Sequence, residues 1–124
     1  MPVERVVIME DSALVCRDLL TLASGTAITQ ASCTSISYRV CDVEDVSTVV
    51  ASGTWTISDV IFDTLQVPAS WTRDTTGYNF GAELPASCFP AGNKIYRVDI
   101  ALVLTTGQTL RWAKEVSTLE REGG

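Results

Sequence analysis

The residue types that carry out most acid–base and nucleophilic catalysis are missing or scattered in this chain. It contains no histidine, which excludes a Ser-His-Asp or Cys-His arrangement and leaves no imidazole base. Two carboxylate pairs remain to be weighed, Asp59 with Asp63 and Glu83 with Asp99, and each would have to meet across strands. Paired catalytic carboxylates need a cleft that raises the pKa of one of them. A small domain with short loops offers little of such a cleft, so we expect no catalytic residue and no enzyme.

Metal and cofactor sites find equally little support. The four cysteines, Cys16, Cys33, Cys41 and Cys88, lack the C-x-x-C spacing of zinc sites. The acidic loop 42–47 lacks the alternating oxygen ligands and the glycine of a calcium loop, and no glycine-rich phosphate cradle precedes a helix. We therefore predict no metal and no cofactor. Four cysteines allow three pairings, and one bridge stays open, but reduced and mostly buried thiols are the expectation.

The tryptophans are the first candidates for a binding face, because exposed indoles stack on sugar rings and anchor protein interfaces. Trp55 and Trp112 share the parity of aliphatic neighbours in strand-like segments, which places both in the core. Trp71 instead lies in a Pro- and Thr-rich loop, close to Arg73. We predict Trp71 and Arg73 as contact residues.

A second candidate contact is the apolar run near the N-terminus, Val6, Val7, Ile8 and Met9, which charged residues flank on both sides. Four successive apolar residues are expected to pair with the edge of a sheet. That sheet belongs either to the same chain or to a neighbour that receives an extended arm. The charged flanks favour the neighbour, because they keep an exposed edge soluble until it is paired.

Charge and hydropathy exclude several classes of partner. The formal net charge is −6, from 15 acidic and 9 basic residues, so the chain repels phosphate backbones and anionic lipid surfaces. No apolar run reaches the ~20 residues that span a bilayer, and the N-terminus has acidic residues where a signal peptide is basic. We expect no nucleic acid and no membrane as partner. Cytoplasmic synthesis is the expectation, with a virion as one destination.

The segment 94–104 has the clearest strand pattern in the chain. Its even-numbered residues from Tyr96 to Leu104 are apolar, while Arg97 and Asp99 occupy the other face and Lys94 precedes the alternation. Further strands are predicted at 34–43, at 77–84, at 109–118, and as two short strands within 54–65 with a corner near Ser58 and Asp59. The segment 11–23 fits a helix capped by Ser12 or a strand, and we predict the strand.

These elements predict an all-β fold, an immunoglobulin-like antiparallel two-sheet β-sandwich of six to eight strands. Apolar residues at 46% and charged residues at 19% are typical of a single globular domain. We expect an N-terminal arm or edge strand at 1–11, the sandwich at 12–118 and a frayed tail at 119–124.

Four short motifs carry a family resemblance over residues 34 to 117. They are Ile36-Ser37-Tyr38-Arg39-Val40, Trp55-Thr56-Ile57, Leu84-Pro85-Ala86 and Tyr96-Arg97-Val98. In this order they resemble the immunoglobulin-like domains of tailed-phage and prophage virion proteins, and in layout the N-terminal domain of the baseplate upper protein family. The resemblance implies a structural or docking module without catalytic residues.

Residue types and resemblance together favour a non-enzymatic structural or protein-interaction module. Its expected partner is a protein, either a virion component or a second copy of the chain in a homo-oligomer. The alternative is a carbohydrate-binding sandwich that uses loop aromatics, with Trp71 as the main contact.

Overall fold

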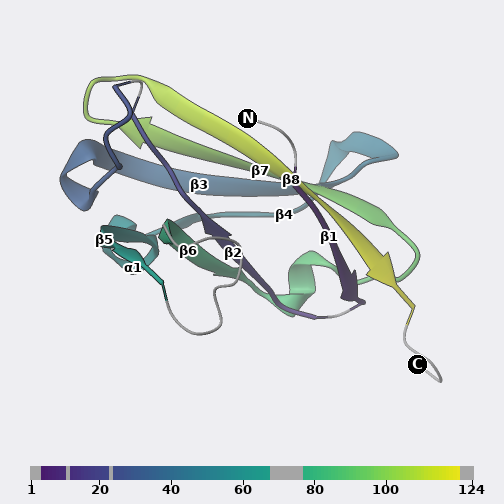
Figure 1. Cartoon of the computed structure of the whole chain (residues 1–124). Coiled ribbons are helices and arrows are strands. Elements are labelled where there is room, and N and C mark those ends of the chain that lie inside the picture. The colour runs from purple at the N-terminus through teal and green to yellow at the C-terminus, as the bar shows by residue number, and fades with distance from the viewer. Residues whose placement is uncertain (1–3, 11, 23, 68–76, 121–124) are drawn as a thin grey trace.

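Eight β-strands and three short helical segments form the computed structural model, which describes residues 4–10, 12–22, 24–67 and 77–120 (Figure 1). The strands are β1 (Glu4–Met9), β2 (Leu14–Asp18), β3 (Cys33–Asp42), β4 (Asp45–Trp55), β5 (Ile61–Gln66), β6 (Tyr78–Leu84), β7 (Ile95–Leu104) and β8 (Thr109–Leu119). The helical segments are two 3-10 turns, Gln30–Ser32 and Ala86–Cys88, and the single turn α1 (Ile57–Val60).

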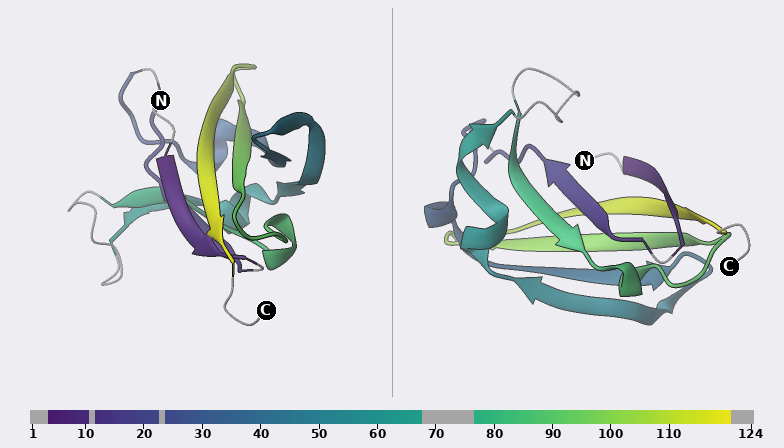
Figure 2. Two further views of the ribbon diagram at one scale, coloured as in Figure 1. Left: turned by 90° about the vertical axis from the view of Figure 1, so that its right-hand side faces the viewer. Right: turned by 90° about the horizontal axis from the view of Figure 1, so that it is seen from below.

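The strands form two sheets that face each other as layers (Figure 2). The five-stranded sheet has the order β1-β8-β7-β3-β4, and the three-stranded sheet has the order β2-β6-β5. The order matches that of an immunoglobulin domain. In one sheet β8, β7 and β3 correspond to strands G, F and C, and in the other β2, β6 and β5 correspond to strands B, E and D. The predicted sandwich is therefore confirmed. Among the described strands one pair departs from the antiparallel expectation, because β1 runs parallel to β8.

The pattern that defines β7 is confirmed residue by residue. Its even-numbered residues are all buried, and the odd-numbered residues between them lie on the outer face. β7 lies between β8 and β3, so backbone hydrogen bonds satisfy it on both sides. The core consists of such inward residues from both sheets, including Ile36, Phe80, Leu84, Val98 and Ile100.

A buried tyrosine fixes the start of β7. The hydroxyl oxygen of Tyr96 accepts a hydrogen bond from the backbone N–H of Ala91 at 3.1 Å, and the Tyr96 ring packs edge-on against Phe89. A tyrosine at the start of strand F that bonds back to the preceding corner is a hallmark of immunoglobulin domains. Two residues later such domains carry the second cysteine of their inter-sheet disulfide, where this chain has the buried Val98.

Aromatic side chains join the two sheets. Trp112 is buried and packs edge-on against Phe80 with ring centroids 5.3 Å apart, which confirms its predicted core position. Trp55 is half-buried against the same Phe80 and stacks on Tyr38 at 4.6 Å. The Tyr38 ring covers Gly53, its register partner in β4. A Cβ atom at position 53 would lie 2.8 Å from the Tyr38 hydroxyl oxygen, so only glycine fits there without a shift of the ring.

Three further expectations are resolved by the strand bounds. The segment 11–23 contains the strand β2 and no helix among its described residues. The predicted corner near Ser58 is the helical turn α1, which separates β4 from β5, but the strand before it is not the short one expected within 54–65, since β4 has 11 residues. The acidic loop is shorter than expected, since β4 already begins at Asp45. No disulfide joins any of the four cysteines; three of them are buried, and Cys33 is half-buried.

Candidate functional site

The predicted contact residues fall in two different parts of the chain. Trp71 and Arg73 lie outside the described residues, in the segment 68–76. Val6, Val7, Ile8 and Met9 form most of β1. Val6 and Ile8 pack against the core, whereas Val7 and Met9 point outward with 63% and 41% of their surface exposed.

β1 belongs to the sheet of its own chain. Its six residues pair in regular parallel register with Lys114 to Leu119 of β8. The run therefore takes the edge-strand alternative within its own chain, and it is not an arm that leaves its own sheet. The physical reason is that without β1 the five-stranded sheet would end at β8 with an unpaired edge. β1 pairs with that edge, and its even-numbered side chains, Val6 and Ile8, pack against the core.

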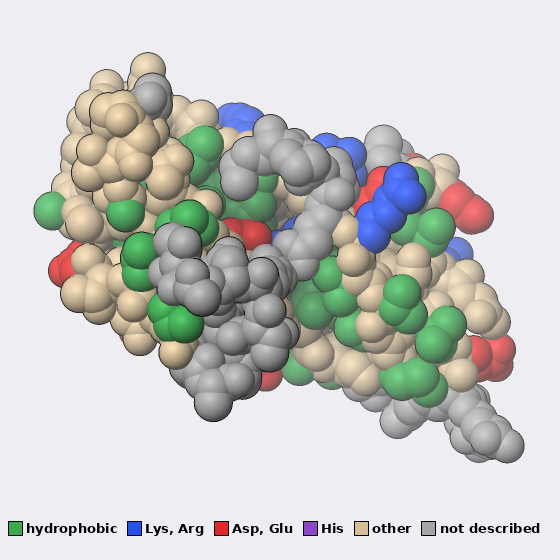
Figure 3. All heavy atoms as spheres, in the orientation of Figure 1, with side chains coloured by type: hydrophobic (Ala, Val, Ile, Leu, Met, Phe, Trp, Pro, Cys, Tyr) green, Lys and Arg blue, Asp and Glu red, His purple; other side chains and the backbone are tan. Residues whose placement is uncertain are grey.

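Exposed apolar side chains surround β1 on the outer face of the five-stranded sheet. We define the outer patch as Val7, Met9, Ile95 and Leu119, which are between 41% and 63% exposed. The register makes them neighbours: Met9 lies beside Leu119, while Val7 and Ile95 lie on either side of Ser117. Figure 3 shows hydrophobic side chains at the surface over β1, at the lower right.

Ion pairs flank the outer patch on the same sheet. The Nε atom of Arg5 lies 3.3 Å from a carboxylate oxygen of Glu115, and Arg97 pairs with Asp99 at 2.9 Å. Near the turn between β3 and β4, the backbone N–H of Glu44 and the Lys94 ammonium hold the pKa of Asp42 below its ordinary value. Each of these carboxylates is thus paired, and the apolar side chains between them remain uncovered by the described residues.

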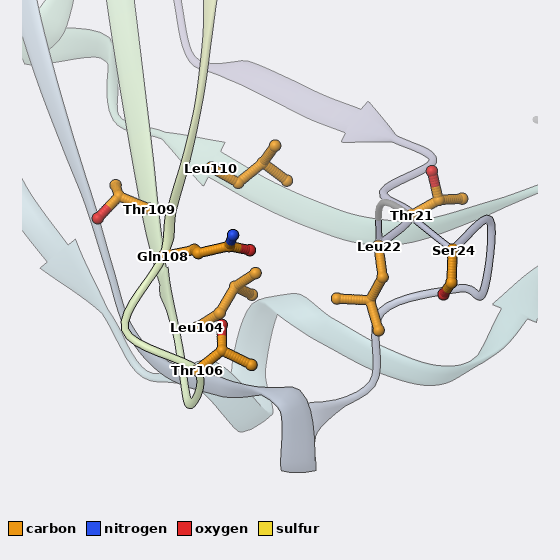
Figure 4. A pocket seen from close by; sticks show the side chains of 8 residues that line it. All are labelled: Thr21, Leu22, Ser24, Leu104, Thr106, Gln108, Thr109 and Leu110. Carbon is orange, nitrogen blue, oxygen red and sulfur yellow. The ribbon is translucent and has the colours of Figure 1, made fainter.

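A cleft of about 780 Å³ opens at one end of the sandwich (Figure 4). One wall is the β7–β8 hairpin, from which Leu104, Gln108 and Leu110 point toward Leu22 in the loop between β2 and β3. Thr21, Ser24, Thr106 and Thr109 make up the rest of the lining, and the Thr109 side chain points away from Leu22. None of these eight lining residues is charged or aromatic. The two loops are those that correspond to B–C and F–G, which form part of the antigen-binding end in variable domains, an analogy of fold alone.

A buried asparagine positions the loop wall of this cleft. Asn79 in β6 is 1% exposed and accepts a hydrogen bond from the Leu20 N–H at 2.7 Å. Its amide nitrogen donates to the carbonyl oxygens of Leu20 and Ile28, at 2.8 and 2.9 Å. The segment from Leu20 to Ile28 is therefore fastened at both ends to the three-stranded sheet.

A second buried polar group links the sheets near β1. The Lys114 side chain is 2% exposed, and its ammonium lies 3.1 Å from one carboxylate oxygen of Asp18 in β2. The indole N–H of Trp112 donates to the other oxygen of Asp18 at 3.1 Å. Neither Asn79 nor Lys114 was predicted as an interior residue. Lys114 has the parity of the buried Trp112 and Val116, and that spacing is the signal that could have indicated it.

The carboxylate pairs weighed for catalysis are separated or already engaged. Glu83 lies in β6 and Asp99 in β7, which belong to different sheets. Asp59 lies within the turn α1, and Asp63 in β5 accepts a hydrogen bond from the backbone N–H of Gln30. Among the described residues no three histidine, cysteine, aspartate or glutamate side chains gather as metal ligands. Within the same ranges no helix has the length and hydropathy needed to cross a bilayer.

Two of the cysteines, Cys33 and Cys88, have thiols that are harder to deprotonate than an ordinary thiol. Burial raises the pKa of Cys88, and burial together with the charge of Asp63 raises the pKa of Cys33. A raised pKa disfavours the thiolate, which is the nucleophilic form. The arrangement therefore offers surfaces for binding, namely the outer patch with the β1 edge and the uncharged cleft. Comparison with protein-family models, with characterised proteins and with solved structures finds no match for this chain.

Proposed function

We propose that the chain is a non-enzymatic protein-interaction module that binds protein through the outer patch and the adjoining edge of β1. The observation that carries the proposal is the position of four exposed apolar side chains beside an unpaired sheet edge. Contiguous apolar surface of this kind is typical of protein–protein contact, and an open edge adds backbone hydrogen bonds to it. The resemblance to baseplate-type immunoglobulin-like domains adds a setting, a structural role in a tailed-phage or prophage virion.

A binding measurement with matched variants tests this proposal. Calorimetric titrations of the chain against itself and against each protein encoded beside it should find a partner. Ile95→Lys places a charge in the outer patch without touching β1, and it should weaken that binding at least about tenfold, because burying an unpaired charge is costly. Val15→Lys is the control, since Val15 is a similarly exposed valine on the other sheet. Binding that Ile95→Lys leaves unchanged, or that Val15→Lys weakens equally, would contradict the proposal.

A second candidate function is the binding of an uncharged, hydroxyl-rich ligand such as a carbohydrate, which the cleft favours. Its hydroxyl and amide rim matches the hydrogen-bonding groups of a neutral sugar, and its volume suits a small ligand. The lining includes three leucines and no aromatic residue on which a sugar ring could stack, and Trp71 lies outside the described residues. A glycan array tests it: signal that Gln108→Ala and Trp71→Ala both reduce would support it, and an empty array would remove it.

A further inference from the structure

Four of the eight described strands lie at a sheet edge, and β1 is the one best suited to pair with another chain. β4 pairs with β3 through register shifts next to Cys41, and β5 meets β6 in an irregular ladder. β2 has five residues and ends in Arg17 and Asp18, whereas the two charged residues of β1, Glu4 and Arg5, precede its apolar run. Such bulges and charges are how natural edges avoid pairing. β1 has a regular register along its whole length and four consecutive apolar residues.

Alternate residues of β1 direct their backbone groups to opposite sides. In a parallel pair, every second residue points its N–H and C=O toward the neighbouring strand, and the residues between point away. The Glu10 N–H donates to the carbonyl of Leu119 in β8 at 2.8 Å, so the even-numbered residues of β1 face β8. The odd-numbered residues, Arg5, Val7 and Met9, therefore direct their backbone groups toward the open edge.

We infer that two copies of the chain pair through β1, as antiparallel strands around a two-fold axis that passes through Val7. This inference rests on the proposed function, and it names the partner as a second copy. In this register Val7 lies opposite Val7 of the second copy and Arg5 lies opposite its Met9. Arg5, Val7 and Met9 of each copy then each lie opposite a residue of β1 in the other copy, so their backbone groups can form hydrogen bonds. A shift of two residues in either direction leaves at least one of them without a partner in the strand.

The side chains agree with this register. On the outer face the two Val7 side chains meet at the axis, and the Met9 and Leu119 side chains of each copy lie close to it. On the inner face Val6 lies opposite Ile8 of the second copy, so apolar side chains meet on both faces. The two five-stranded sheets become one continuous sheet through an isologous contact. Each copy carries a net charge of −6, so added salt should strengthen the pairing by screening the repulsion.

Sedimentation velocity of the full chain, from micromolar to millimolar concentration, tests the pairing. We expect a reversible monomer–dimer equilibrium. Val7→Lys should weaken it at least about tenfold, because two like charges would stand directly opposite each other at the axis. Val7→Pro should weaken it similarly, since proline removes an N–H that β8 does not use. Val15→Lys is the matched control and should sediment like the unchanged chain.

Backbone amide exchange of the unchanged chain tests the register without any substitution. At low concentration the amides of Val6 and Ile8 should be protected by β8, while those of Arg5, Val7 and Met9 exchange freely. At high concentration the latter three should become protected as well. A dimer in which these three amides still exchange freely would overturn the pairing and leave the proposed function standing. A chain that stays monomeric at millimolar concentration would overturn it too, whereas the proposed function fails only if no protein binds in an Ile95-dependent manner.

Discussion

Replacement of Asn79 by alanine should be among the most destabilising single changes that remove no apolar core side chain. The asparagine makes three buried hydrogen bonds to the main chain of the β2–β3 loop. A buried hydrogen bond contributes about 1 kcal/mol net, and each main-chain group left without a partner adds a desolvation cost. We therefore expect Asn79→Ala to lower the free energy of unfolding by about 3–5 kcal/mol. That is a large fraction of the ~5–15 kcal/mol typical of a domain.

Urea denaturation measures this loss, and amide exchange locates it. The Leu20 N–H, which donates to Asn79, should exchange much faster in Asn79→Ala, while the amides of β7 keep their order of protection. Gln108→Ala is the control, because Gln108 is exposed at the same end of the sandwich and should change stability by less than about 0.5 kcal/mol. A loss under about 1 kcal/mol for Asn79→Ala, with unchanged exchange at Leu20, would refute the bracing role of Asn79.

Three further predictions concern the core, the acidic turn and the thiols. Ile100→Ala in β7 should cost about 2–5 kcal/mol in urea denaturation by leaving a cavity, and a cost below about 1 kcal/mol would contradict its core position. The lowered pKa of Asp42 means that this carboxylate stabilises the fold above its unfolded-state pKa and loses that effect as the pH falls through its folded-state pKa. The stability difference between the unchanged chain and Asp42→Asn should accordingly be largest at neutral pH and shrink in acid. A difference that is constant with pH would argue against the hydrogen bonds that Asp42 accepts from the Glu44 N–H and the Lys94 ammonium. The raised pKa values of Cys33 and Cys88 predict slow reaction of the folded chain with a thiol reagent at neutral pH, with faster reaction in alkali or urea. Rapid labelling of either cysteine at neutral pH in the native state would count against their burial.

The fold could be predicted largely because alternation carries so much information in this chain. In β6 and β7 the even-numbered residues are apolar without interruption, and a strand with one buried face leaves that pattern in the sequence. β1 was harder. Its four successive apolar residues show no alternation, so the sequence did not indicate which of them face the core. That β8 is its partner could be learned only from the structure.

The buried polar residues show the other limit of sequence reasoning. Asn79 sits on the face of β6 opposite Phe80, where a polar residue predicts solvent exposure, yet the β2–β3 loop folds over it. Lys114 is hidden because Asp18, distant in the chain, supplies its counter-charge. Both residues depend on contacts between segments far apart in sequence, and only for Lys114 does a local pattern, the parity it shares with Trp112 and Val116, indicate burial. The outer patch has the same origin, since its four members come from three strands.

A two-dimensional 15N NMR dilution series tests the central claim most directly, that the chain pairs with a second copy through the β1 edge. Amide signals followed from micromolar to millimolar concentration report every surface at once. We expect concentration-dependent shifts at Arg5, Val7 and Met9 and at their neighbours Ser117 and Leu119, with the cleft residues Leu22 and Gln108 unchanged. Shifts confined to the cleft, or none anywhere on the chain, would contradict the account.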